Sequence, residues 1–161
     1  MAFDGFMQLD GIEGESSDAK YKGWIEISDC NMEIMQNVST TASSVGGASA
    51  ARADFSNLRF TKLMDKSSPQ LALACAKGTH FNTVRVEFCR AGSEKITFMA
   101  IKLTDCLIST VTMNAGGHFP TETIHLDYGA INWTYTQQSR KGGMTMGNTA
   151  AGWNRRKNCP A

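Results

Sequence analysis

The sequence lacks any long hydrophobic run and any excess of charge of one sign. No apolar segment approaches the roughly 20 residues that a membrane-spanning helix needs, and the formal net charge of the 161 residues is +1. The start, MAFDGFMQLD, has neither the basic segment nor the apolar core of a secretory signal peptide. We therefore expect one soluble domain over residues 1–161, made in the cytoplasm, without membrane insertion or nucleic acid binding.

Paired cysteines are missing as well. The five cysteines are Cys30, Cys75, Cys89, Cys106 and Cys159. Their odd number, wide spacing and lack of a C-x-x-C pair fit neither a disulfide framework nor a zinc site. We expect Cys75, Cys89 and Cys106 to be small buried hydrophobes, because they lie in predicted helix or strand segments. Cys159, in the tail, is the one candidate for a reactive thiol.

Motifs for catalysis or for cofactor binding are not found either. Gly46-Gly47 is not followed by Gly-Lys-Ser/Thr, and the chain has no G-x-S-x-G or H-E-x-x-H sequence. The nearest approach to a metal site is His118, Glu122 and His125, whose simpler interpretation is as ordinary polar strand residues. We predict no catalytic, cofactor-binding or metal-binding residues and no enzyme activity.

One convincing helix is present, in the segment Ser67–Gly78, SSPQLALACAKG. Ser67 or Ser68 can cap the first free N–H groups, Pro69 suits the first turn, and Ser67 and Gln70 have the spacing of a capping box. Gly78 can adopt the left-handed conformation that ends a helix. Leu71–Ala76 contains no charged side chain, so the helix must be covered by its own sheet or by another subunit.

Short strands make up most of the remaining sequence. The predicted strands are Ala2–Leu9, Gly23–Gln36, Phe55–Met64, Thr83–Arg90, Lys95–Leu103, Asp105–Met113, Thr121–Tyr128 and Ala130–Gln137. Ala150–Trp153 could return as a last strand or as an arm. The apolar parity of Gly23–Gln36 changes midway, which predicts a bend near Ser28–Asn31 where the chain passes between sheets. This pattern indicates a mainly β fold, a compact barrel or sandwich with one helix.

Two segments lack the apolar residues needed for a core. Asn37–Asp54 is rich in Ser, Ala and Gly, so we expect a long mobile loop there, and by hypothesis Val38–Asp54 reaches a neighbouring subunit or ring. The tail over residues 139–161 is expected to be flexible from Ser139 to Asn148.

The two ends of the chain carry opposite charge. Residues 1–33 contain eight acidic side chains against Lys20 and Lys22, whereas from Ser139 onward there are five basic residues and no acid. These ends could pair within the fold, or between subunits stacked head to tail. In the second case, stacking should be sensitive to salt.

Several segments share their residues and their order with one protein family. They are Asp10–Asp18, Gly23–Ile27, Phe60–Lys62, Asp65–Leu71, Ala74–Gly78 and Gly152–Asn154 with Asn158. Together they resemble the Hcp family, the haemolysin-coregulated tube proteins of type VI secretion systems. The resemblance covers nearly the whole chain.

This resemblance implies a two-sheet β-barrel with one flanking α-helix and a long extended loop. It also implies a homo-hexameric ring with an open lumen, and stacking of rings into a tube within a contractile sheath tipped by spike proteins. Contraction would drive a subunit that is cytoplasmic before firing out of the cell without a signal peptide. Small effector proteins would be carried in the lumen.

Candidate residues follow from the helix, the loop and the tail. The assembly candidates are Ser43, Val45, Gly46, Gly47, Ser68, Pro69, Leu73, Arg155 and Arg156. Asn31 is a candidate for the lumen, with an ordinary exposed strand residue as the alternative. The rival interpretation of the whole chain is a small monomeric β-barrel that binds a ligand or a metal, or is an enzyme.

Overall fold

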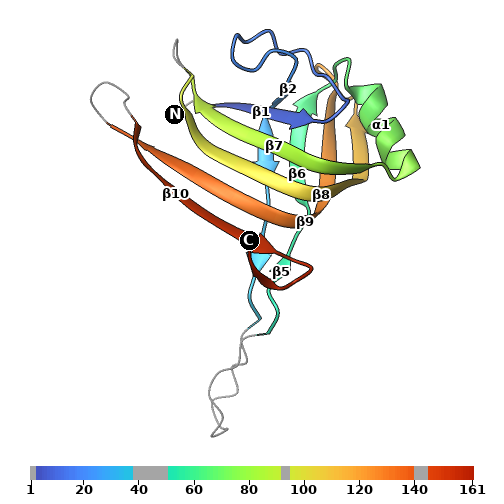
Figure 1. Cartoon of the computed structure of the whole chain (residues 1–161). Helices are drawn as coiled ribbons and strands as arrows, with labels where there is room; N and C mark the ends of the chain where they lie inside the picture. The colour runs from blue at the N-terminus through green and yellow to red at the C-terminus, as the bar shows by residue number, and fades with distance from the viewer. Residues whose placement is uncertain (1–2, 38–50, 92–94, 140–144) are drawn as a thin grey trace, which may run out of the picture.

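The computed structural model describes residues 3–37, 51–91, 95–139 and 145–161, and it shows a bent β structure with one helix at its side (Figure 1). The strands are β1 (Phe3–Leu9), β2 (Ile25–Ile27), β3 (Asp29–Asn31), β4 (Ile34–Met35), β5 (Asp54–Phe55), β6 (Leu58–Leu63), β7 (His80–Arg90), β8 (Thr97–Asn114), β9 (Thr121–Gln138), β10 (Thr145–Asn154) and β11 (Cys159–Pro160). The helix is α1 (Ser68–Lys77). The predicted mainly β class, with two sheets and one flanking helix, is confirmed.

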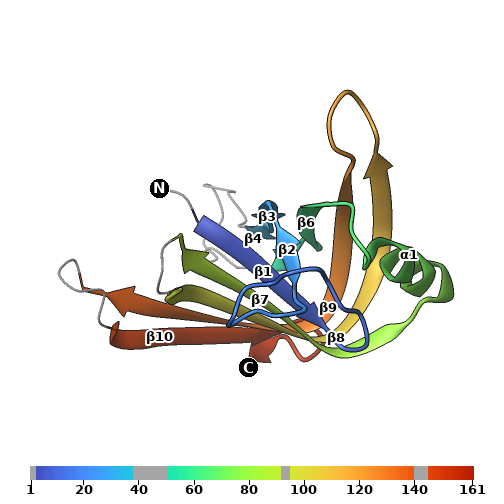
Figure 2. The ribbon, with the colours of Figure 1, turned by 90° about the horizontal axis from the view of Figure 1, so that it is seen from above.

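Two long strands join the layers. The ladder runs β11-β10-β9-β8-β7-β1-β2, and β6, with β3 beside it, pairs with the first half of β9. β8 and β9 have 18 residues each, and Figure 2 shows their hairpin turning away from the large layer. The prediction of four short strands here was wrong. Asp105, on β8, has a positive φ of 56°. Gly129, on β9, lies so close to it that a Cβ on Gly129 would be 3.2 Å from the Asp105 Cβ. The paired strands β8 and β9 therefore bend at these two residues, and both continue beyond the bend.

The chain passes between the layers where the parity of the sequence changes. β2 pairs with β1, whereas β3 pairs with β6, and Ser28 separates the two strands. The predicted bend is thus confirmed. In the tail, the prediction of a flexible segment over 139–148 was wrong for Thr145–Asn148, because these four residues belong to β10.

A closed apolar core lies between the layers and under the helix. Its fully buried members come from both layers and from α1, and include Met7, Ile25, Leu58, Phe60, Leu71, Val86, Leu103, Ile124, Leu126 and Ile131. Cys89 and Cys106 are buried as predicted, whereas Cys75 and Cys159 are only half-buried. Burial raises the pKa of the Cys106 thiol to about 12, which keeps it protonated.

The ends of α1 are partly as predicted. Gly78 ends the helix in the left-handed conformation, with φ 62°, and its N–H donates to the Cys75 carbonyl at 3.1 Å. At the start, however, the predicted side-chain cap and capping box were wrong. Ser67 has helical φ and ψ, and its hydroxyl donates to the Asp65 carboxylate, so it does not cap a helix N–H group.

The loop between β1 and β2 is well packed although its sequence is polar. Tyr21 is buried and stacks on Phe6, with ring centroids 4.2 Å apart. Its hydroxyl lies 2.7 Å from both the Glu87 carboxylate and the Thr97 hydroxyl. The burial of Tyr21 raises the pKa of its phenol. This loop is therefore held against the outer face of β7 and β8.

Candidate functional site

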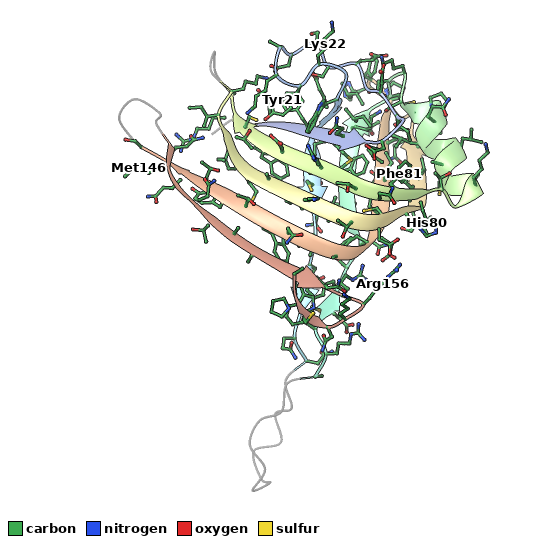
Figure 3. The ribbon with its side chains drawn as sticks, in the orientation of Figure 1. Tyr21, Lys22, His80, Phe81, Met146 and Arg156 are labelled. Atoms are coloured by element: carbon green, nitrogen blue, oxygen red, sulfur yellow. The ribbon has the colours of Figure 1, made fainter. Side chains whose placement is uncertain are left out.

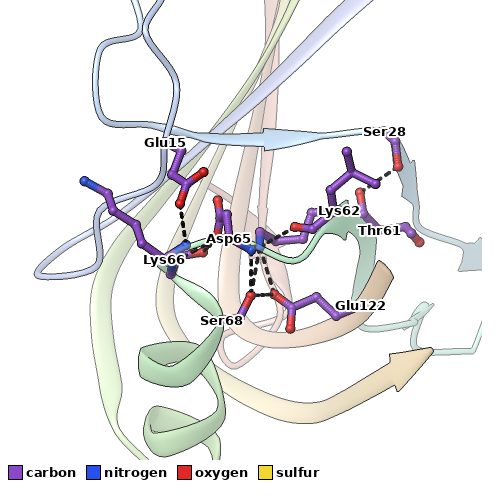
Figure 4. A network of polar contacts seen from close by, with 10 residues as sticks. Glu15, Ser28, Thr61, Lys62, Asp65, Lys66, Ser68 and Glu122 are labelled. Atoms are coloured by element: carbon purple, nitrogen blue, oxygen red, sulfur yellow. Dashed lines mark hydrogen bonds and ion pairs between the residues drawn. The ribbon is translucent and has the colours of Figure 1, made fainter. Parts of the chain in front are cut away.

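A buried ion pair fastens the start of α1 to the sheet. Lys62, on β6, is 1% exposed, and its Nζ lies 2.8 Å from Glu122 Oε1 on β9 and 2.7 Å from Asp65 Oδ1 (Figure 4). The Ser68 hydroxyl in the first turn of α1 also donates to Glu122 Oε1, at 2.6 Å. The residues that carry the family resemblance in this region therefore make a structural network.

The network leaves one carboxylate oxygen without a partner. Glu122 Oε2 is buried and accepts no hydrogen bond from the described residues. Although burial raises the pKa of Asp65, its hydrogen bonds to Lys62 and Ser67 outweigh that effect and hold the pKa below its usual value. Ser68, predicted to be an assembly residue, is 7% exposed and is occupied within the network.

The outer face of α1 is open to solvent, and Lys77 in the last turn is its charged side chain. Pro69, Leu73 and Ala76 are exposed and recur at helical spacing, and the Leu73 residue is 44% exposed. Leu71 and Ala74, on the inner face, are buried in the core. We call Pro69, Leu73 and Ala76 the helix stripe. Since the core uses only one face of α1, the stripe is an apolar surface that the described residues do not cover.

A second apolar surface, which the described residues leave partly exposed, lies at the other side of the molecule. Phe88, Met99 and Tyr135 are aligned across β7, β8 and β9 on the face that forms the core further along. Phe3 makes an edge-to-face contact with Phe88, with centroids 5.7 Å apart. Phe3 is 49% and Tyr135 45% exposed, so this face extends past the strands that cover it. We call these four residues the apolar shelf.

The shelf and the stripe lie at opposite sides of the molecule. α1 and the start of β7 lie at one side of the ribbon, whereas the start of β1 and the end of β9 lie at the other, in both views (Figures 1 and 2). Met146, 64% exposed, is also on the shelf side (Figure 3). The chain thus carries two different apolar surfaces on opposite sides.

Asn31 lies on a polar sheet face. The rows Asn31–Arg59–His125–Thr110 and Asp29–Thr61–Thr123–Thr112 run across β3, β6, β9 and β8. The row between them, Cys30–Phe60–Ile124–Val111, points to the core, as the alternation of strands requires. We call the two outer rows the polar face. Four of its eight side chains are threonines, and its one ion pair among the described residues joins Arg59 to Asp29 at 3.1 Å.

The candidate metal residues are not brought together. Glu122 is committed to Lys62 and Ser68 inside the fold, whereas His125 is on the polar face, because the two differ in strand parity. Among the residues that the structure describes, no group of three or more His, Cys, Asp or Glu side chains could hold a metal ion. In the same part of the chain, no helix has the length and hydropathy to span a bilayer.

The charged ends pair with the middle of the chain. Arg155 lies 2.8 Å from Asp127 and stacks over the Tyr128 ring at 4.6 Å, and Arg156 pairs with Asp105. At the acidic end, the ion pairs of the described residues run to Lys66, Lys95 and Arg59. Among the described residues, the acidic and basic ends of the chain therefore form no ion pair with each other, contrary to the alternative in which they pair within one fold.

Four of the predicted assembly residues come from the segment between β4 and β5. Ser43, Val45, Gly46 and Gly47 lie outside the described residues. The surfaces that the sequence did not predict are the apolar shelf and the threonines of the polar face. Alternation within Ile131–Tyr135 was a signal for the shelf, but strand alternation does not tell which end of an apolar face is covered.

Comparison with known proteins gives one consistent result. Residues 6–135 match the model of the family described as type VI secretion system effector, Hcp. The sequence is 30% identical to the protein hcp1 of Pseudomonas aeruginosa, over an alignment of 164 residues that covers both chains completely. A solved structure described as a type six secretion system protein has a TM-score of 0.93 at 32% identity, covering 99% of this chain and 100% of its own. Hcp1 from Salmonella typhimurium has a TM-score of 0.81 at 27% identity, covering both chains completely.

Proposed function

Because the chain belongs to the Hcp family of type VI secretion system effectors, we propose that it is a ring-forming subunit of a secretion tube. Six copies would surround an open lumen, and the rings would stack inside a contractile sheath that carries spike proteins at its tip. The subunit would be cytoplasmic before contraction and secreted by it. Its work would be structural rather than enzymatic.

The pair of uncovered apolar surfaces is the observation that carries this proposal. The helix stripe and the apolar shelf differ in residues and lie on opposite sides, so they suit a heterologous contact, in which one side of a copy meets the other side of the next. Such contacts continue until the rotation closes a ring. Neither surface includes a charged side chain, and Lys77, one turn after Leu73, lies at the edge of the stripe, where its long side chain can keep the ammonium group in water.

The polar face supports a role as the lumen wall. Its threonines and Asn31 are solvent-accessible. The same strands are held from their other side by the row Cys30–Phe60–Ile124–Val111, whose side chains pack in the core. A polar wall without a large apolar patch would hold small effector proteins loosely enough to release them. The residues Val38–Asp54 would reach the neighbouring ring, and deleting Ser43–Ala51 should then leave rings but prevent stacking. Long tubes from the deleted chain would contradict that assignment of the loop.

Oligomeric state tests the ring directly. Native mass spectrometry of the purified chain should give a hexamer, and negative-stain images should show rings with a central hole. A monomer at high protein concentration would favour the rival ligand-binding barrel, and stoichiometric bound metal, lost in His125→Ala, would favour the metal-binding alternative.

A mixing experiment tests the two apolar surfaces. Leu73→Glu and Tyr135→Glu should each be monomeric, because each places a charge in one side of the contact. Mixed in equal amounts, they should form dimers only, since one intact junction remains and the chain cannot continue. Gln8→Glu is the matched control, because it adds the same charge beside Arg85 on the opposite face of the sheet and should leave rings intact. Rings from both variants would contradict the assignment of these surfaces.

A further inference from the structure

A groove is present at the end of the molecule where the loop between β1 and β2 lies. It has a volume of about 490 Å³, and its apolar lining comes from Ile27, Leu63, Met64 and Phe119. The Leu63 residue is 53% and the Phe119 residue 66% exposed. Glu15 and Glu26 are also part of its wall, and the lining contains no basic residue. The groove therefore combines apolar surface with negative charge.

The wall of this groove is held in place before any partner arrives. The Glu15 Oε1 atom accepts the Lys66 backbone N–H at 2.9 Å (Figure 4). Gly14 lies so close to β2 that a Cβ on it would be 2.3 Å from the Trp24 carbonyl oxygen, and Ser16 is buried. Neither Glu15 nor Glu26 forms an ion pair with another described residue. Their charges are thus available to a partner.

The opposite end of the molecule carries positive charge, which complements the negative charge of the groove. The turn after β10 presents Arg156, whose side chain is 69% exposed, and Lys157, which is exposed and has no carboxylate within ion-pair distance among the described residues. Lys22, in the loop beside the groove, and Arg156 lie at opposite ends of the molecule in Figure 3. The aliphatic stems of Arg and Lys can lie on apolar surface while their charged groups reach carboxylates.

We propose that this groove receives the Arg156–Lys157 turn of a second copy of the chain in the next ring. The inference rests on the proposed function, since it names the surfaces through which proposed rings would stack head to tail. Lys157 pairs with Glu26 or Glu15, and the stems of the two basic residues cover Leu63 and Phe119. An exposed ion pair contributes a factor of about 1.5 or more to an association constant. Six repeats of that factor at one ring junction amount to about tenfold.

Charge reversal and charge exchange test the pairing. Glu26→Lys and Lys157→Glu should each keep hexameric rings in native mass spectra but reduce the ring–ring association constant at least tenfold. Sedimentation velocity over a concentration series at low salt measures that constant. The doubly exchanged chain should recover most of the association, and high salt should weaken stacking in both wild type and exchanged chain. Lys102→Glu, beside Arg85 on the large sheet, makes the same charge change away from both ends and should stack as wild type does.

The possible contrary results distinguish a wrong groove assignment from a wrong proposal for the ring. Normal stacking of either single variant, failure of the exchanged chain to recover, or no species larger than a ring in the wild type would overturn the groove assignment while leaving the ring intact. A wild-type chain that forms no ring would overturn the proposed function itself.

Discussion

Replacing Lys62 by Met would test whether the buried network holds the fold together. The Lys62 ammonium group lies 2.7 Å from the Leu63 carbonyl, 2.7 Å from Asp65, 2.8 Å from Glu122 and 3.3 Å from Ser68. Without it, the fully buried Glu122 carboxylate has no opposite charge. Removal of one partner from a buried pair typically costs about 3–5 kcal/mol of unfolding free energy. For a chain of this size that lowers the Tm by about 6–20 °C.

A double variant separates the charge from the packing. Lys62→Met with Glu122→Leu removes both charges, so most of the loss should be recovered and the unfolding free energy should lie within about 2 kcal/mol of wild type. Lys77→Met, on the exposed end of α1, is the control and should cost less than about 1 kcal/mol.

Urea unfolding followed by circular dichroism measures these differences. All variants must be compared at one protein concentration, because assembly adds to apparent stability. A loss below about 1 kcal/mol for Lys62→Met, or a double variant less stable than the single one, would refute this account of the network.

Three further predictions concern other buried contacts. Gly14→Ala should lower the unfolding free energy by about 1–3 kcal/mol, because its Cβ would meet the Trp24 carbonyl at 2.3 Å, and a Tm unchanged in a thermal melt would contradict this. The pKa of Asp65 is lowered in the fold, so its contribution is present above the unfolded value of about 4 and is lost as the pH falls through the folded value. The stability difference between wild type and Asp65→Asn, measured in urea from pH 7 to pH 2.5, should shrink below about pH 4, and a constant difference would count against it. Cys106, with a pKa raised to about 12 and no exposed surface, should resist alkylation at pH 8 until urea unfolds the chain, as read by mass spectrometry.

The network illustrates how far sequence reasoning reached in the candidate site. Ser67, Ser68 and Pro69 predicted where α1 begins, and that was confirmed. The expected side-chain capping was wrong, because the Ser67 hydroxyl donates to Asp65 and the Ser68 hydroxyl donates to Glu122, which is distant in the sequence. The same Glu122 appeared in the sequence as a possible metal ligand. Local spacing could not distinguish these roles, because the outcome depends on which strand pairs with β6.

By itself, the sequence determined the mainly β class, the single helix with its glycine end, the change of sheet near Ser28 and the family resemblance. Each of these depends on local conformational preference, on strand alternation or on matched segments, which neighbouring residues carry. Tertiary structure alone decided that two long strands bend at Asp105 and Gly129, that Tyr21 packs under a polar loop, and that the shelf stays uncovered. Those features depend on register and on how far one layer extends past the other, and both are set by contacts between residues distant in the chain.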